Sequence, residues 1–166
     1  SARLTWDQET MMPRGATAQR AEEIATIEGV LHSRRTDERI SDWLDACSDI
    51  PLQNVARAQL QHIRRDYERN SKIPERLAIE IAKTTSIAQG IWVSARKNNC
   101  FSEFAPILTE VLSLRKEQAV ILSAGENLYD ALLEEFEPAT KGSDLRKMFD
   151  SLRPHLIALR SEILEQ

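Results

Sequence analysis

Glycine and cysteine are both scarce in this sequence. Five of the 166 residues are glycine, about 3% against a usual value of about 7%. A β-barrel or β-sandwich needs many tight turns, so neither fold is expected, and neither is a glycine-rich phosphate loop. The two cysteines, Cys47 and Cys100, are too few for a disulfide framework. This cysteine usage favours a reducing, cytoplasmic location.

An excess of basic residues and a long apolar run are also missing. Lys and Arg together number 22 against 26 Asp and Glu, which gives a formal net charge of −4. A general nucleic-acid binder ordinarily carries a basic excess, so no nucleic-acid partner is expected. No stretch approaches the roughly 18 consecutive apolar residues of a membrane span. The chain opens without the basic-then-apolar pattern of a signal peptide.

The two ends of the sequence resemble internal positions of a longer protein. The chain begins at Ser1 without an initiator Met, and it closes at Gln166 in a helical pattern that has no stop signal. We therefore expect residues 1–166 to be one helical region of a longer parent protein whose catalytic part lies elsewhere.

Helical periodicity dominates what is present. Apolar residues recur at steps of three and four, with polar residues opposite, and no stretch alternates as a strand does. This pattern predicts an all-α bundle of about six or seven helices. The segment 74–98 is apolar on more than one side, so we expect it to be the most buried helix. Gly90 and its small neighbours would allow another helix to approach closely.

Several local signals suggest where helices begin and end. Thr36 is expected to cap a helix through its hydroxyl group, and Pro51 to occupy the first turn of the next. Residues 70–72 are expected to form a loop. Ser143 is expected to cap the last helix, and Pro154 to kink or divide that helix.

The three histidines are the first candidates for metal ligands. His32 lies four residues after Glu28 and His62 four residues before Asp66, so each pair shares a helix face. A zinc site needs a third ligand, and the sequence marks none. We therefore favour structural roles for both pairs, and a partly exposed packing role for His155, which follows the proline of the last helix.

No residue lies in a recognisable setting for nucleophilic catalysis. Cys47 belongs to an inward-facing stripe, while Cys100 lies at a loop where it would be accessible. Charged clusters have an ordinary explanation as solvated, salt-bridged surface. These clusters are the basic set Arg57, Arg64, Arg65 and Arg69 and the acidic set Glu134, Glu135 and Glu137.

The least routine segment is residues 4–13, which combine a tryptophan, two acids, two methionines and a proline. One interpretation is a hydrophobic plug, in which Trp6, Met11 and Met12 pack over the bundle and Asp7 caps a short helix. The other is a wall of a substrate groove. From physical chemistry alone, the plug is the favoured interpretation.

The same segment carries a resemblance to a known family. LTWDQETMMP, followed by AQRAEEIATIEGVLH, is similar to the start of the carboxypeptidase Taq family of zinc metallocarboxypeptidases. The similarity continues through IRRDYERNSKIPERLAIEIAKTTSIAQGIWVSARKNNCFSEFAPILTEVLSLRKEQA and LYDALLEEFEPATKGSDLRKMF, and so covers about residues 4–166. Phe136 stands where Tyr is expected and Ala139 where Gly is expected, and both departures bear on local packing.

The resemblance implies a long, nearly all-helical enzyme that removes C-terminal residues from peptides. Family members bind a divalent metal, commonly zinc, through a His-Glu-x-x-His helix and a later Glu, with the Glu of that motif acting as general base on metal-bound water. No position of this sequence matches that motif, so the resemblance assigns no catalytic, cofactor-binding or metal-binding residue here. It implies a peptide substrate for the parent protein, and homodimers are common in the family.

Two hypotheses of different classes follow. The first is an amino-terminal helical region of a cytoplasmic zinc metallocarboxypeptidase, inactive alone, that walls the substrate groove. The second is a free-standing helical bundle that serves as an interaction module. A His-Glu-x-x-His motif encoded after Gln166 would support the first, and a stop codon the second. Under the first hypothesis, we expect exposed apolar surface at Trp6–Met12 and along Leu156–Ile163.

Overall fold

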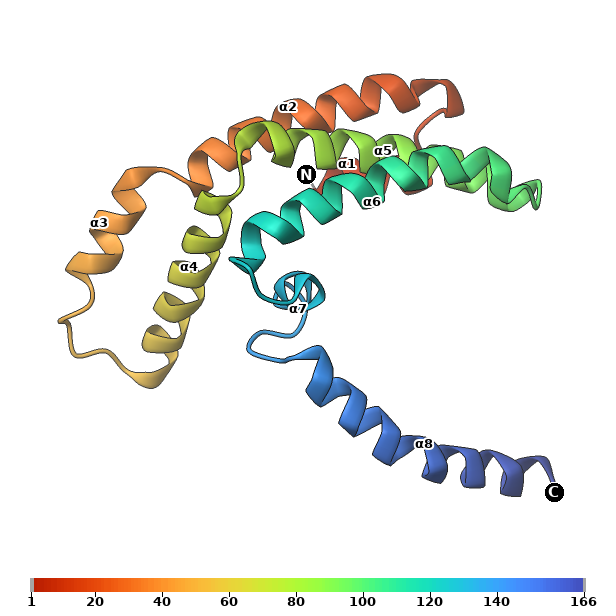
Figure 1. The fold of residues 1–166 in the computed structure, drawn as a ribbon. Helices are drawn as coiled ribbons and strands as arrows, with labels where there is room; N and C mark the ends of the chain where they lie inside the picture. The colour runs from red at the N-terminus through yellow and green to blue at the C-terminus, as the bar shows by residue number, and fades with distance from the viewer. Residues whose placement is uncertain (1, 166) are drawn as a thin grey trace. The chain divides into compact units, whose positions relative to one another are not determined.

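The computed structural model describes residues 2–165, and these residues form helices and loops without a strand. The predicted all-α class is confirmed. The helices are numbered in chain order in Figure 1. They are α1 (Ala2–Thr10), α2 (Thr17–Arg35), α3 (Glu38–Ala46), α4 (Asn54–Lys72), α5 (Glu75–Lys97), α6 (Phe101–Ser123), α7 (Leu128–Leu133) and α8 (Gly142–Leu164), with a 3-10 turn at Arg14–Ala16. None of the described helices is both long enough and apolar enough to cross a membrane.

The chain divides into two compact units, residues 1–121 and 122–166. The first holds α1 to α5 and most of α6, and the second holds α7 and α8. That residues 1–166 form one region of a larger protein stays a prediction.

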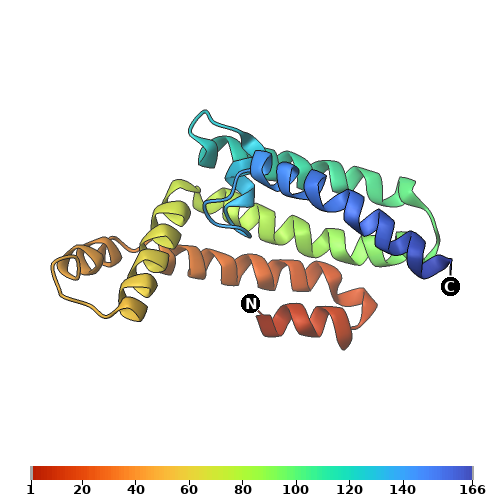
Figure 2. The same ribbon diagram turned by 90° about the horizontal axis from the view of Figure 1, so that it is seen from below.

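The first unit is built on the pairing of α2 with α5, which lie side by side in Figures 1 and 2. On α2, Ala21 is fully buried and Ala25 is nearly so, and on α5 Leu77 is fully buried. Small residues allow the close approach. A methyl group added at Gly90 would lie 2.9 Å from Cγ2 of Thr17 on α2, so no larger residue fits without a shift. The predicted role of Gly90 is confirmed.

Helix α5 carries five buried residues, more than any other described helix, as expected from its apolar pattern. The covering of α5 is nevertheless incomplete, because Trp92 keeps 48% of its surface exposed and Val93 keeps 47%. Polar contacts attach α6 to α5. Arg76 pairs with both Glu80 and Glu117, and the hydrogen bond that Arg76 donates to Glu117 raises the pKa of the Arg76 guanidinium.

Helix α1 is held by polar contacts. Arg20 of α2 donates to Oδ2 of Asp7 at 2.6 Å and to the carbonyl oxygen of Leu4 at 2.8 Å. It also pairs with Glu23 at 2.9 Å, and we call these four residues the Arg20 cluster. Gln8 and Ser86 exchange two hydrogen bonds that join α1 to α5.

Several predicted boundaries were wrong. Asp37, not Thr36, caps α3, because its carboxylate accepts the backbone N–H of Arg39 while the Thr36 hydroxyl donates to the carbonyl of His32 at the end of α2. Pro51 lies in a loop, since α4 begins at Asn54. Residues 70–72 continue α4.

The last helix also differs from its predicted form. It begins at Gly142, so Ser143 lies inside its first turn and does not cap it. Of the two predicted effects of Pro154, division of the helix is wrong, because α8 continues from Gly142 to Leu164. A kink agrees with Figure 1, in which the ribbon of α8 changes direction about halfway along. A proline inside a helix removes one backbone hydrogen bond and bends the axis.

We predict that the start of α3 loses stability in acid. The side-chain hydrogen bond from Arg39 lowers the pKa of Asp37 from 3.8 to about 2. Because the folded-state pKa is the lower one, the stabilisation is complete above pH 3.8 and disappears as the pH falls from 3.8 towards 2. The fluorescence of Trp43, whose ring centroid lies 5.8 Å from the Arg39 guanidinium carbon, would report the change. Asp37→Asn should abolish this acid-induced change in fluorescence, and Asp42→Asn should preserve it. The reverse result would contradict the assignment of the change to Asp37.

We also predict that Ala139→Gly stabilises the protein. Ala139, which stands where glycine is expected, has a left-handed φ of 61°. The methyl group of alanine strains the backbone in that conformation, so the substitution affects more than local packing. Removing a strain of about 1 kcal/mol, offset in part by the greater freedom of glycine in the unfolded chain, should raise the free energy of unfolding by about 0.5 kcal/mol.

The matched control is Gly125→Ala, at a φ of 94° with no atom within 4 Å of the added methyl group. That substitution should destabilise by about 1 kcal/mol through the backbone alone. Urea unfolding measures both variants, and a destabilised Ala139→Gly protein would refute the strain argument.

Candidate functional site

The structure does not bring the histidines together. His32 is nearly buried on α2, and its Nε2 atom lies 2.8 Å from the carbonyl oxygen of Ile73. Its neighbour Glu28 pairs with Arg35 at 3.6 Å. His32 thus has a structural role, as predicted, but its partner is the backbone between α4 and α5.

The other two histidines lie at the surface. Nδ1 of His62 is 3.2 Å from the Arg65 guanidinium, and His155 is exposed on α8. Within residues 2–165, no three His, Cys, Asp or Glu side chains are grouped so that they could hold a metal ion. The described residues therefore do not fit the divalent metal that the resemblance implies.

The cysteines and the basic set also have structural surroundings. Cys47 lines a hollow of 240 Å³ between α3 and α4, together with Leu44 and Leu60. Cys100 is partly exposed, and its Sγ atom lies 3.2 Å from the Ser102 hydroxyl. Arg64 pairs with Asp45 at 2.9 Å, which agrees with the predicted salt-bridged surface.

The segment Trp6–Met12 differs from its favoured interpretation. Trp6 keeps 59% of its surface exposed and Met11 keeps 71%, so they do not form a plug. Asp7 lies inside α1 and binds Arg20, and so it does not cap the helix. The plug interpretation was wrong because polar contacts, through the Arg20 cluster and Gln8, hold α1 in place. The indole of Trp6 is left free to contact another molecule.

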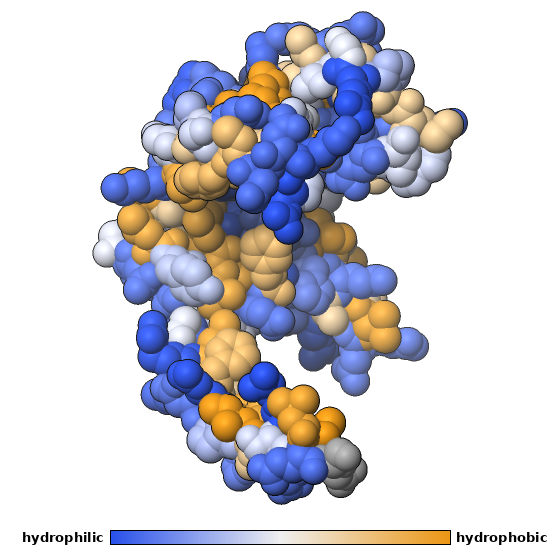
Figure 3. Space-filling view, turned by 90° about the vertical axis from the view of Figure 1, so that its right-hand side faces the viewer, coloured by the Kyte–Doolittle hydropathy of each residue, from blue (hydrophilic) through white to orange (hydrophobic). Residues whose placement is uncertain are grey.

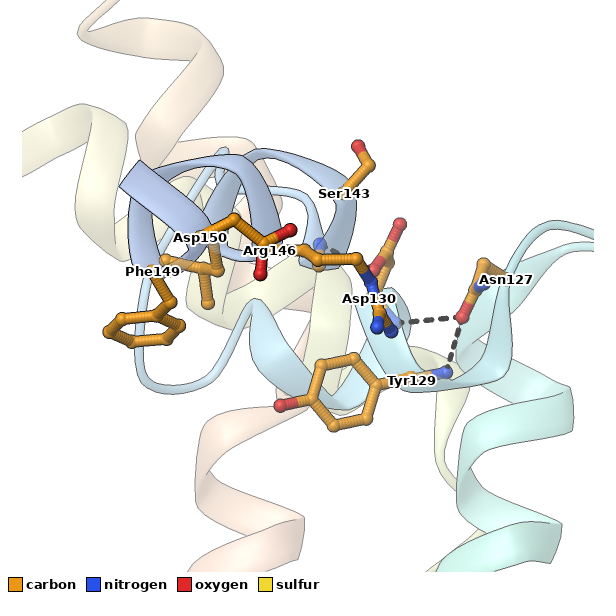
Figure 4. Close-up of a pocket in the computed structure, with 9 residues that line it drawn as sticks. Asn127, Tyr129, Asp130, Ser143, Arg146, Phe149 and Asp150 are labelled. Atoms are coloured by element: carbon orange, nitrogen blue, oxygen red, sulfur yellow. Dashed lines mark hydrogen bonds between the residues drawn. The ribbon is translucent and has the colours of Figure 1, made fainter. Parts of the chain in front are cut away.

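A hollow of 670 Å³ lies in the second unit (Figure 4). It falls within the range of about 300–1,000 Å³ that is usual for small-molecule sites. Its walls come from the start of α7 and the first turns of α8. They are lined by Asn127, Tyr129, Asp130, Gly142, Ser143, Leu145, Arg146, Phe149 and Asp150.

Two caps shape this hollow. The side chain of Asn127 accepts the backbone N–H groups of Tyr129 and Asp130 and so starts α7. Oδ1 of Asp130 accepts the backbone N–H of Gly142 at 2.8 Å, which joins the start of α8 to α7. An asparagine directly before a helix is a known capping signal, and it could have been read from the sequence here.

The chemistry of the hollow suits binding better than catalysis. Arg146 offers a guanidinium group, Asp150 a carboxylate, Ser143 a hydroxyl and Tyr129 an aromatic ring. The residues that line it include no histidine or cysteine, and they present no paired nucleophile and base. Sequence reasoning did not anticipate this site, because its walls come from two helices joined by a turn whose path the residue pattern does not reveal.

Comparison with known proteins identifies the family. Residues 1–166 match the model of the carboxypeptidase Taq (M32) metallopeptidase family. Thermostable carboxypeptidase 1 of Thermus thermophilus is 37% identical over 177 residues, which cover 98% of this chain and 34% of that protein. The chain aligns with the N-terminal part of its relatives.

Solved structures agree with the sequence match. The crystal structure of BsuCP matches with a TM-score of 0.87 at 28% identity, covering 98% of this chain and 33% of that one. Metallocarboxypeptidase 1 of Trypanosoma cruzi matches with a TM-score of 0.74 at 27% identity, again covering 98% and 33%. The chain therefore spans about a third of the length of these relatives. On this evidence, it belongs to the carboxypeptidase Taq (M32) metallopeptidase family.

Proposed function

We propose that this chain is the amino-terminal helical part of a zinc-dependent metallocarboxypeptidase that removes C-terminal residues from peptides. The observation that carries the proposal is the family match over residues 1–166, combined with alignment to the N-terminal part of carboxypeptidases three times as long. In this proposal the chain contributes scaffold and a wall of the substrate groove, and the catalytic groups lie in the rest of the parent protein.

The metal belongs to the parent protein in this proposal. Family membership implies a divalent metal, and the described residues group no set of ligands that fits one. Zinc and its ligands are accordingly assigned to residues outside this chain. The net charge of −4 and the two free cysteines support a cytoplasmic protein without a nucleic-acid partner. A homodimer of the parent completes the proposal, by analogy with the family.

The groove-wall role is assigned to α1. Trp6 lies on α1, and its indole is exposed. The Arg20 cluster attaches α1 to α2, and the Gln8–Ser86 pair attaches it to α5. A large aromatic group on a fixed backbone is well suited to contact a peptide, because little conformational freedom is lost on binding.

We predict that the purified 166-residue chain binds no stoichiometric zinc and releases no amino acid from a blocked dipeptide. The reason is that the described residues lack a grouped ligand set. Elemental analysis and an amino-acid release assay test both parts. One tightly bound zinc that is lost in His32→Ala or His62→Ala would refute the assignment of the ligands to the rest of the parent.

We predict further that Trp6→Ala in the intact parent lowers kcat/KM for peptide hydrolysis by about tenfold, equivalent to about 1.4 kcal/mol of lost transition-state stabilisation. Trp43→Ala is the matched control, because Trp43 is equally exposed, at 60%, but lies on α3. Equal activity of the two variants would refute a groove-wall role for α1.

A further inference from the structure

Helix α8 leaves most of its apolar stripe exposed, from Phe149 to Ile163, while Leu145 is half-buried. No described residue of this 23-residue helix is buried. Leu152 keeps 44% of its surface exposed and Ile163 keeps 63%, and Figure 3 shows apolar side chains open to view around the C-terminal end of the helix. An amphipathic helix ordinarily buries such a stripe against another element. The exposure of its Leu156–Ile163 part was expected from the sequence.

The spacing of the stripe indicates what kind of element would cover it. Its central positions alternate steps of four and three residues along the entire helix, and we call this set the α8 seam. The seam consists of Leu145, Phe149, Leu152, Leu156, Leu159 and Ile163. Alternating steps of four and three residues keep the apolar line facing a second helix that runs nearly parallel or antiparallel to it. The α8 seam therefore fits a long helix.

A row of arginines follows one edge of the α8 seam. Arg146, Arg153 and Arg160 are spaced seven residues apart, and each directly follows a leucine of the seam. All three are exposed, and none forms an ion pair among the residues that the structure describes. Charged residues in this position select the partner of a helix by pairing with opposite charges. The covering helix is thus expected to carry acidic residues along the facing edge.

The arginine row disfavours a second copy of α8 as the partner. In an antiparallel pair of seams, the two arginine rows would face each other. In a parallel pair, each row would face Met148, His155 and Glu162 of the other copy, of which only Glu162 is acidic.

One helix of this chain carries acidic residues at a matching spacing, but two of its carboxylates are already engaged. Helix α6 has Glu103, Glu110 and Glu117 at the same spacing of seven. Of these, Glu110 accepts a hydrogen bond from Thr84, and Glu117 pairs with Arg76. Two of the three carboxylates are thus used within the first unit.

We propose that α8 packs lengthwise against an acidic-edged helix in the part of the parent polypeptide that this chain does not include. Two observations support that occupant. The chain spans about a third of the length of its relatives, and the exposed arginine row would pair best with acidic side chains on the covering helix. The inference rests on family membership and is independent of the proposed peptidase activity.

Cysteine accessibility tests the proposal in the intact parent. Leu159→Cys places a thiol in the α8 seam, and Ala158→Cys places one on the opposite, polar side, in a background with Cys47→Ser and Cys100→Ser. In the 166-residue chain, both thiols should react with a maleimide at similar rates. In the parent, the thiol at 159 should react about 100-fold more slowly than the thiol at 158, because it reacts only when the packing opens.

Equal rates in the parent would overturn the proposal. Protection of position 159 already in the 166-residue chain would overturn it too, because the cover would then come from this chain or from a second copy, which light scattering distinguishes. Circular dichroism and thermal unfolding of both parent variants show whether each is folded, so that loss of protection through unfolding is recognised. Peptide hydrolysis by the same variants is measured separately, so a failure of the proposed activity is not confused with a failure of the packing.

A charge reversal tests the acidic edge. Arg153→Glu should speed the reaction of the thiol at 159 in the parent by about tenfold, since a carboxylate would then face the acidic row. Lys147→Glu makes the same change of charge on the polar side of α8 and should leave the rate unchanged. Equal effects of the two reversals would refute an acidic partner.

Discussion

The close approach of α2 and α5 is the constraint on which the first unit depends. Ala21 and Ala25 on one helix and Gly90 on the other keep the two backbones near each other. Helix α1 is attached to both of these helices, and α6 is attached to α5. The His32 side chain joins α2 to the carbonyl oxygen of Ile73 just before α5. A core made from small side chains gains less from apolar burial than one made from leucines. Its polar connections are correspondingly important.

Those polar connections explain why the first helix presents a large aromatic residue outward. Arg20 donates hydrogen bonds to the Asp7 carboxylate and to the backbone carbonyl oxygen of Leu4, both on α1. Only 13% of the Arg20 side chain is exposed. The hydrogen bond that Arg20 donates to Asp7 raises the pKa of this guanidinium, which favours its charged form. Trp6 is not needed to attach the helix, and its surface remains available.

Periodicity in the sequence was enough to predict the helical class and the central place of α5, because both follow from which faces are apolar. Helix ends were predicted less well. Thr36 and Asp37 are adjacent and both are capping types, so the choice between them depends on backbone geometry. The exposure of Trp6 depends on Arg20, which lies fourteen positions further along. The α7–α8 hollow depends in the same way on a turn that brings Asp130 to Gly142, and neither contact is visible in a local pattern.

Pro154 bears on the order in which the helices form while the chain is being synthesised. An interior proline costs a helix about 3 kcal/mol, and α8 has no buried side chain to offset it. As a nascent segment leaving the ribosome, α8 is therefore a poor independent helix. The α2–α5 pair needs nothing beyond residue 97 and can assemble first, in keeping with the N-terminal-first folding of long chains. Under the packing proposed above, α8 becomes stable only after the segment that covers it has been translated, so it folds later than the α2–α5 pair.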